Sequence, residues 1–323
     1  FDIYKGESVC VVGPNGGGKS TLLKLMLGLL QPDQGRVHLL GDTPKRSRSR
    51  VGYVPQHIDF DPLFPVTVLD VVLMGRLERS TFGFANRRDT SRALEALEQM
   101  GLADRTQDSF AALSGGQRQA VLIARALAAE VDVLLLDEPL SNLDAKLREQ
   151  MRFEILELQR KIGVTTVYVT HDQEEALSIA DRVGVMRNGQ LEQIAAPAEL
   201  YDRPKTSFVA EFVGLTNPIS GKVSGGSIEV LGSVVKTLPG SVTSGTGIAL
   251  IRPESVDVVA SKSGNATVAA ASFLGASCRL SITMNDGTKI TAQLPSSDAA
   301  GIGAGATVSV SLLDMPVFVK AAG

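Results

Sequence analysis

The first two-thirds of the chain alternates between short, continuous apolar runs and longer segments whose apolar residues recur every three or four positions. The runs at residues 7–12, 131–136 and 165–169 are predicted to be strands buried on both faces. Residues 144–162 and 173–180 follow the helical period. Strands that alternate with helices form a mostly parallel sheet, so this part is predicted to be an α/β domain.

Shorter elements complete this pattern. Residues 36–40 and 51–55 are predicted to be short strands. Residues 182–186 and 190–194 are predicted to be two strands joined by an Asn-Gly turn. Each of these segments can extend the sheet.

An amphipathic helical insert interrupts the α/β pattern. Residues 67–77 and 89–100 have apolar residues at helical spacing, and a further helix is predicted from Ser114 to about residue 129. Ser114 is a favourable N-cap residue. We therefore expect a helical subdomain at about residues 63–118.

The pattern changes near Gly214. From there short alternating runs follow one another, as at residues 221–230 and 307–312, and they are rich in Gly, Ser, Thr and Val. This part is predicted to be a small all-β domain, a barrel. At 323 residues the chain accommodates two domains, which we predict at 1–214 and 215–323.

The charge balance narrows the class of partner. A formal net charge of −3 gives no general attraction to nucleic acid. The basic stretch at residues 45–50 is interpreted as a solvated loop, with a binding patch as the alternative.

No apolar run is long enough to span a bilayer. Cys10 and Cys278 have no metal-binding spacing, which suits a reducing cytosol.

A glycine-rich stretch joins the first predicted strand to the first helix. Backbone N–H groups in such a loop converge on phosphate oxygens, and the helix N-terminus adds its positive dipole end. Lys19 can reach the outer phosphates, and the Ser20 hydroxyl can bind Mg²⁺. A structural turn is the alternative. The predicted nucleotide-binding residues are Gly13, Pro14, Asn15, Gly16, Gly17, Gly18, Lys19, Ser20 and Thr21.

Two carboxylates end the apolar run at 131–136. Asp137 is placed to hold Mg²⁺ through its water shell, and Glu138 can orient or deprotonate the attacking water. His171 ends a neighbouring predicted strand, where its imidazole can contact a terminal phosphate. Helix-start carboxylates and a structural histidine are the alternatives.

Taken together, these motifs resemble those of ABC transporter ATPases. The resemblance covers residues 1–214, and the sequence Ile251-Arg252-Pro253-Glu254 resembles part of the TOBE domain of many bacterial import ATPases. The resemblance to ABC transporter ATPases implies a P-loop NTPase fold of the ABC type with a helical subdomain. The resemblance at residues 251–254 implies that an OB-like TOBE domain follows it. The motifs that carry the resemblance to ABC transporter ATPases are 13–21, Gln56, 113–117, 136–139, 141–144 and 170–172.

The resemblance also implies roles for residues that spacing alone does not assign. Gln56 would couple the metal and the attacking water to the helical insert, and Asp144 would lie in the loop that links two active sites. ATP and Mg²⁺ are the implied cofactors. The signature motif would close on ATP held by the opposite subunit, and its residues are Ser114, Gly115, Gly116 and Gln117.

The implied partners follow from the same family. We expect a homodimer of ATP-binding subunits, working with two transmembrane permease subunits and, indirectly, an extracytoplasmic solute-binding protein. The chain would lie peripherally on the cytoplasmic face of the plasma membrane. No nucleic-acid partner is expected.

Two features depart from the family pattern. The adenine-stacking aromatic residue belongs to a strand upstream of the phosphate loop, and Tyr4 is too close to the loop to replace it, so we expect that this N-terminal strand is missing. The stretches 52–57 and 64–76 resemble ATPases of zinc and manganese importers. By contrast, residues 137–148 and 170–176 resemble those of spermidine/putrescine, ferric-iron, phosphonate and sugar importers.

The function predicted from the sequence is ATP hydrolysis that energises import of a small solute of the polyamine, ferric-iron, phosphonate or sugar type. A zinc or manganese importer ATPase is the first alternative. Two others come from different classes: a soluble ABC ATPase that acts on nucleic acid or ribosomes, and a catalytically weak regulatory module.

Overall fold

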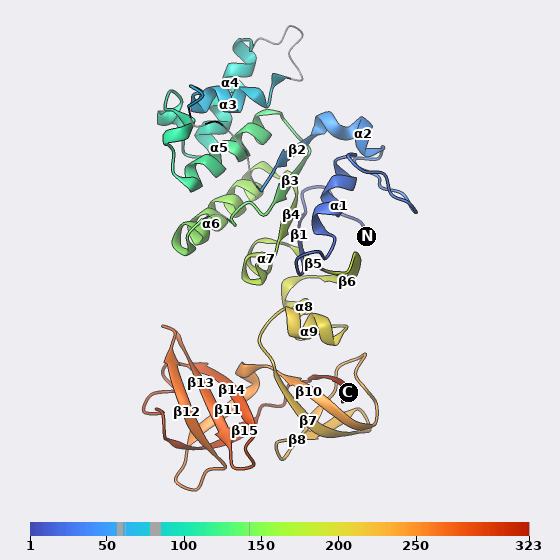
Figure 1. Ribbon diagram of the computed structural model, residues 1–323, viewed down its shortest axis with the longest axis vertical. Coiled ribbons are helices and arrows are strands. Elements are labelled where there is room, and N and C mark those ends of the chain that lie inside the picture. The colour runs from blue at the N-terminus through green and yellow to red at the C-terminus, as the bar shows by residue number, and fades with distance from the viewer. Residues whose placement is uncertain (57–60, 62, 78–84, 142, 323) are drawn as a thin grey trace. The chain divides into compact units, whose positions relative to one another are not determined.

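The chain folds into two compact units, Phe1–Pro197 and Ala198–Gly323 (Figure 1). The division precedes the change in composition near Gly214, because helices α8 (Pro197–Asp202) and α9 (Ser207–Phe212) belong with the β-rich part. The computed structural model describes residues 1–56, 61, 63–77, 85–141 and 143–322.

A six-stranded sheet organises the first unit. Its spatial order is β2-β3-β4-β1-β5-β6, and every neighbouring pair is parallel except β5 and β6. The predicted α/β class with a mostly parallel sheet is confirmed. The strands are β1 (Ser8–Val12), β2 (Val51–Val54), β3 (Val133–Asp137), β4 (Thr165–Thr170), β5 (Arg182–Arg187) and β6 (Gln190–Ala195).

Helices surround this sheet, and α3, α4 and α5 pack against one another as a separate group (Figure 1). Capping boxes begin α3 at Thr67, α4 at Asn86 and α5 at Ser114. Among the described residues, no helix is both long and apolar enough to cross a membrane. The helices are α1 (Lys19–Met26), α2 (Pro44–Ser47), α3 (Val68–Met74), α4 (Arg87–Gln99), α5 (Gly115–Ala128), α6 (Ala145–Ile162) and α7 (Gln173–Ile179), with 3-10 turns η1 (Arg48–Arg50), η3 (Ala103–Arg105) and η4 (Phe110–Ala112).

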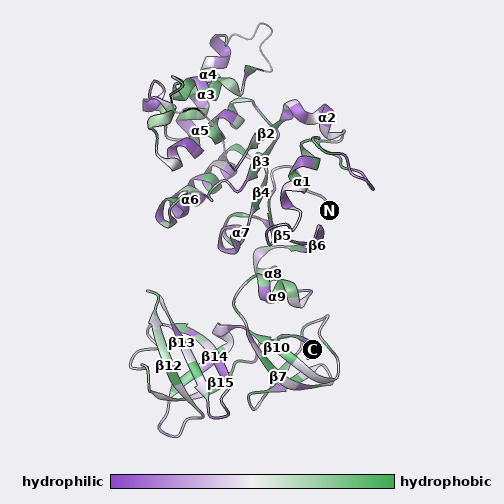
Figure 2. Ribbon diagram, viewed as in Figure 1, coloured by the Kyte–Doolittle hydropathy of each residue, from purple (hydrophilic) through white to green (hydrophobic). Residues whose placement is uncertain are grey.

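The apolar runs become the centre of the sheet. Every residue of β1 and β4 is buried, and Figure 2 shows β3 and β4 as hydrophobic. In the parallel register Val12 pairs with Thr170, and Asp137 pairs with Val169. The segments that follow β1, β3 and β4 therefore leave the sheet at the same edge, where open α/β sheets bind ligands.

Two local predictions are wrong. Residues 36–40 do not form a strand, because the chain turns back at once: Leu39 pairs with Asp42 through two backbone hydrogen bonds, and Leu40 and Gly41 both have positive φ. Residues 45–50 are not a loop but lie in α2 and η1. Their basic side chains are exposed, as the solvated interpretation expects.

The second unit is β-rich, as predicted. Its sheets have the orders β16-β10-β7-β8-β9 and β11-β15-β12-β13-β14, and residues of both contribute to one buried apolar cluster. A short η5 turn (Pro253–Ser255) lies between β10 and β11. The strands are β7 (Asn217–Ser224), β8 (Ser227–Val230), β9 (Ser233–Lys236), β10 (Gly245–Ile251), β11 (Val256–Ala260), β12 (Ala266–Phe273), β13 (Ser277–Met284), β14 (Lys289–Pro295), β15 (Thr307–Leu312) and β16 (Phe318–Ala321).

Candidate active site

The glycine-rich loop connects β1 to α1, and its backbone requires glycine at several positions. Gly16 and Gly18 have φ values of 77° and 101°, which side chains with a Cβ rarely adopt. A Cβ on Gly13 would collide with the carbonyl of Met186, and one on Gly17 would lie 2.9 Å from the Pro14 oxygen. Glycine is therefore required both for the turns of the loop and for its close packing against the end of β5.

Lys19 folds back across this loop. Its Nζ donates to the carbonyl oxygens of Gly13 at 2.8 Å and Pro14 at 3.2 Å, and the residue is only 6% exposed. Burial lowers the pKa of the Lys19 ammonium, while Glu138 and Asp137 act in the opposite direction. An ammonium group has three protons to donate, so one remains for an anionic ligand in the loop.

Glu138, which follows β3, contacts side chains from two other segments of the chain. Its Oε2 accepts a 2.8 Å hydrogen bond from Gln56 Nε2 and lies 3.0 Å from His171 Nδ1. Its backbone has a φ of 45°. This uncommon conformation is held by the Glu138 amide, which donates to Val169, and by the Ser141 hydroxyl, which donates to the Glu138 carbonyl. Backbone strain of this kind is concentrated at functional sites.

Asp137 is the last residue of β3, one position before Glu138. Burial raises its pKa, whereas a 3.3 Å hydrogen bond from the Tyr53 hydroxyl acts to lower it. Burial, together with the neighbouring Asp137 charge, raises the pKa of Tyr53 to about 12. Sequence reasoning missed Tyr53. Its only signal is its place near the end of the strand before Gln56, and that position has meaning only once β2 is known to lie beside β3.

The phosphate loop, Gln56, Glu138 and His171 surround one cavity of about 560 Å³. Its lining combines backbone amides of a loop with hydroxyl groups, two amide side chains and a carboxylate, and the oxygen atoms of such side chains suit Mg²⁺. The donor set therefore fits a nucleotide phosphate group with its magnesium ion. The lining residues are Asn15, Gly16, Gly17, Gly18, Lys19, Ser20, Thr21, Gln56, Glu138 and His171.

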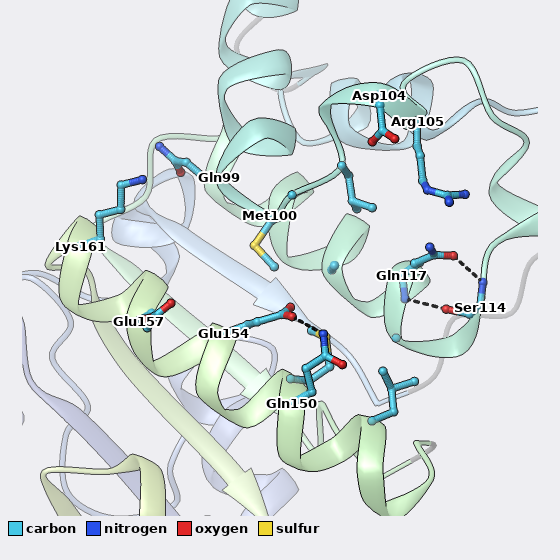
Figure 3. Close-up of a pocket in the computed structure, with 16 residues that line it drawn as sticks. Gln99, Met100, Asp104, Arg105, Ser114, Gln117, Gln150, Glu154, Glu157 and Lys161 are labelled. Atoms are coloured by element: carbon cyan, nitrogen blue, oxygen red, sulfur yellow. Dashed lines mark hydrogen bonds between the residues drawn. The ribbon is translucent and has the colours of Figure 1, made fainter.

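The predicted signature residues lie elsewhere in the first unit. Ser114 caps α5: its Oγ accepts from the Gln117 amide at 3.3 Å, and its own amide donates to Gln117 Oε1 at 3.0 Å (Figure 3). Gly116 packs so closely on α6 that an added Cβ would lie 2.9 Å from Leu147. These residues line a different cavity of about 570 Å³, between α5, α6 and the end of α4 (Figure 3).

Asp144 caps the helix that borders this second cavity. Its side chain accepts a 3.0 Å hydrogen bond from the Leu147 amide. Asn142, which belongs to the same motif, lies outside the described residues. The structure thus brings Gln56, Glu138 and His171 to the phosphate loop, and it leaves Ser114, Gly116 and Gln117 in a cavity of their own. Gly115 is the first residue of α5 and does not line that cavity.

Comparisons with known proteins agree on a family. The model of the "ABC transporter" family matches residues 1–141, and that of the "TOBE domain" matches residues 249–319. The chain is 40% identical over 326 residues to the sulfate/thiosulfate import ATP-binding protein CysA of Xanthomonas campestris pv. campestris, with 98% of this chain and 93% of that protein covered.

Two further matches extend this result. The Fe(3+) ions import ATP-binding protein FbpC of Rhizobium etli is 42% identical over 267 residues, which cover 80% of this chain and 74% of that protein. Among solved structures, a metal-chelate type ABC transporter in an inward-facing conformation matches with a TM-score of 0.59 and 31% identity, over 72% of this chain and 87% of that one.

Proposed function

This chain belongs to the ABC transporter ATPases, as the ATP-binding subunit of a bacterial importer with a TOBE domain, and from that membership we propose a role for each residue of its active site. ATP hydrolysis in the first unit energises import of a small solute. The observation that carries the assignment is the placement of Gln56, Glu138 and His171 around one cavity with the phosphate loop.

The loop residues bind the nucleotide in this proposal. Backbone N–H groups of the loop, other than at Pro14, and the third proton of the Lys19 ammonium bind the phosphates. Ser20, Asp137 and Gln56 hold Mg²⁺, partly through water. The bound ion would offset the negative charge that develops on the transferred phosphoryl group.

Glu138 acts on the attacking water. A carboxylate that already accepts from Gln56 has a fixed orientation, so it can hold a water molecule in line with the terminal phosphate and take its proton. His171 Nδ1 lies 3.0 Å from the same carboxylate oxygen, and a proton on Nδ1 donates to Glu138. With a proton on both ring nitrogens, Nε2 can in addition donate to the terminal phosphate. The two residues thus act on the same reacting group.

A complete active site requires a second subunit. Import subunits of this family work as dimers with permease components. We propose a homodimer in which Ser114, Gly115, Gly116 and Gln117 of one subunit approach the nucleotide on the phosphate loop of the other, with Asp144 in the connecting loop. The separation of the two cavities within one chain supports this arrangement.

The remaining partners follow from the importer class. We propose two permease subunits, a solute-binding protein on the outer side, and a peripheral position on the cytoplasmic face of the plasma membrane. Sulfate or thiosulfate and ferric iron are the solutes of the relatives and are our first candidates. A zinc or manganese solute stays the alternative, because a metal-chelate type transporter is similar in structure. A role on ribosomes or nucleic acid is disfavoured, because an import ATP-binding protein matches 98% of this chain.

ATP hydrolysis by the purified protein tests the roles proposed for Glu138 and Lys19. Glu138→Gln and Lys19→Ala are expected to remove ATP hydrolysis, while Glu149→Gln on the exposed side of α6 keeps it. Steady hydrolysis by Glu138→Gln at the wild-type rate would overturn the role of Glu138. ATPase activity of membranes reconstituted with the permease and solute-binding protein, each solute added in turn, would then identify the cargo.

A further inference from the structure

Arg148 connects two segments that the proposed mechanism uses separately. It lies in the first turn of α6, and its guanidinium donates from Nη2 to the Leu143 carbonyl at 3.0 Å and from Nε to the Leu140 carbonyl at 3.3 Å. Its Nη1 lies 3.5 Å from Asp172 Oδ2. Three nitrogen atoms of one planar group are thus directed at three different acceptors.

The first segment is the loop that leaves Glu138. Leu140 and Leu143 are almost fully buried, so their side chains anchor this loop in the core while their carbonyls face Arg148. The Ser141 amide and hydroxyl both donate to the Glu138 carbonyl, at 3.2 Å and 3.0 Å. A guanidinium that fixes this loop therefore also supports the positive φ of Glu138.

The second segment surrounds His171. Asp172 accepts from the Glu175 amide at 3.1 Å, and its own amide donates to Thr170 Oγ1 at 3.0 Å. Thr170 Oγ1 in turn donates to Glu175 Oε2 at 2.6 Å. The residues on both sides of His171 are thus held by short hydrogen bonds, and Asp172 is the member of this group that contacts Arg148.

We propose that Arg148 is a positioning residue that fixes the Glu138 loop and the His171 segment relative to each other. The inference rests on the proposed function of these two residues. A planar guanidinium can satisfy both carbonyls and the carboxylate at once, whereas an ammonium cannot match this geometry. The 3.0 Å contact between Glu138 and His171 depends on the spacing that Arg148 maintains.

Kinetics provide the first test. Arg148→Gln is expected to lower kcat for ATP about ten-fold or more, because misplacement of reacting groups is costly, while KM for ATP changes less than about two-fold. Arg148→Lys should recover only part of kcat. Arg160→Gln, an exposed arginine on the same helix, is the matched control and should match the wild type. Equal kcat for Arg148→Gln and the wild type would overturn the inference.

A double-mutant cycle on the ion pair of Arg148 and Asp172 provides a second kinetic test. Asn is as good an N-cap as Asp, so Asp172→Asn keeps the start of α7 and removes only the charge. The double variant Arg148→Gln with Asp172→Asn should lose clearly less activity than the product of the two single losses. If the loss of activity in the double variant equals the product of the losses in the two single variants, the two residues do not act together.

Amide hydrogen exchange tests positioning without relying on turnover. In Arg148→Gln, the amides of residues 138, 140, 141, 143 and 144 and of residues 171–175 should exchange faster, while those of β1 and β4 stay protected as in the wild type. Unchanged exchange in both segments would contradict the inference even if activity fell. A wild-type protein without ATPase activity would instead refute the proposed function, and the exchange result would still decide whether Arg148 holds these segments.

Discussion

Gln56 Nε2 donates a 2.8 Å hydrogen bond to Glu138 Oε2, although the two residues are 82 positions apart in the chain. The pairing of β2 with β3 brings them together, because parallel neighbours end at the same edge of the sheet. Gln56 also directly precedes the segment that leads to the helical group α3 to α5. We propose that a movement of that group changes the orientation of the Glu138 carboxylate.

The Gln56 amide is expected to matter for turnover more than for nucleotide binding. Gln56→Ala frees the Glu138 carboxylate to rotate, so we expect kcat to fall about ten-fold or more. Affinity for ATP should stay within about three-fold, because the Lys19 contacts are unaffected. Steady-state kinetics and equilibrium nucleotide binding measure both. Gln34→Ala, exposed in the turn after α1, serves as the control, and equal losses of kcat in both variants would contradict the role of Gln56.

Gly18 is expected to tolerate no side chain. Its φ is 101°, and an added Cβ would lie 3.0 Å from Gly189, so Gly18→Ala should destabilise the protein by about 1–3 kcal/mol and abolish ATP binding. Thermal unfolding and fluorescence-detected nucleotide binding measure these effects. Gly303→Ala is the matched control, because Gly303 has open space around it and no positive φ. Normal ATP binding by Gly18→Ala would show that the loop is not the phosphate site.

Glu175 makes the stability of the first unit depend on pH. It is 2% exposed, and burial raises its pKa; Asp172 acts in the same direction, while the Thr170 hydrogen bond and the charges of Arg152 and Arg148 oppose the shift. At pH values between the pKa of Glu175 in the unfolded protein and its higher pKa in the folded protein, the native state binds more protons than the unfolded state. The stability that Glu175 contributes is therefore complete below its unfolded pKa and is lost as pH rises through the folded pKa.

Neutralising this residue should reverse that loss. Glu175→Gln is expected to raise the unfolding temperature by a few degrees at pH 8, and the difference should shrink as pH falls toward the ordinary range of a glutamate. Calorimetry at several pH values measures the trend. A variant that is less stable than the wild type at pH 8, or a difference that grows toward acid, would contradict the assignment.

The start of the second unit can be tested with fragments. Residues 198–323 include α9, whose Ala210 packs with Leu250 and Phe318, and Tyr201, whose ring lies 4.1 Å from the Arg252 guanidinium. A fragment beginning at residue 215 loses these contacts. We expect the longer fragment to unfold cooperatively and at a clearly higher temperature, as measured by circular dichroism. Equal unfolding temperatures would place the boundary near Gly214 instead.

Local features of this fold were predictable from the sequence because they depend on nearby residues. Continuous apolar runs predicted β1, β3 and β4, and the cap residue Ser114 marked the start of α5. The predicted strand at 36–40 failed because a strand requires a partner, and Leu39 turns back to pair with Asp42.

Contacts between distant segments could not be derived from the residues alone. The bond between Gln56 and Glu138, the hydrogen bond from Tyr53 to Asp137 and the contacts of Arg148 all depend on which strands lie side by side. Periodicity contains no information on that order. The motif resemblance predicted which residue types gather at the site, and the structure supplies the distances between them.

The central claim is that two copies of this chain complete each other's active site. Light scattering on the Glu138→Gln variant tests it most directly, with ATP added while Mg²⁺ is withheld and then supplied. We predict a monomer that becomes a dimer on addition of ATP and remains one, because the variant binds the nucleotide and cannot hydrolyse it. Persistence of the monomer at millimolar ATP, with nucleotide binding confirmed in the same sample, would contradict a site shared between two subunits.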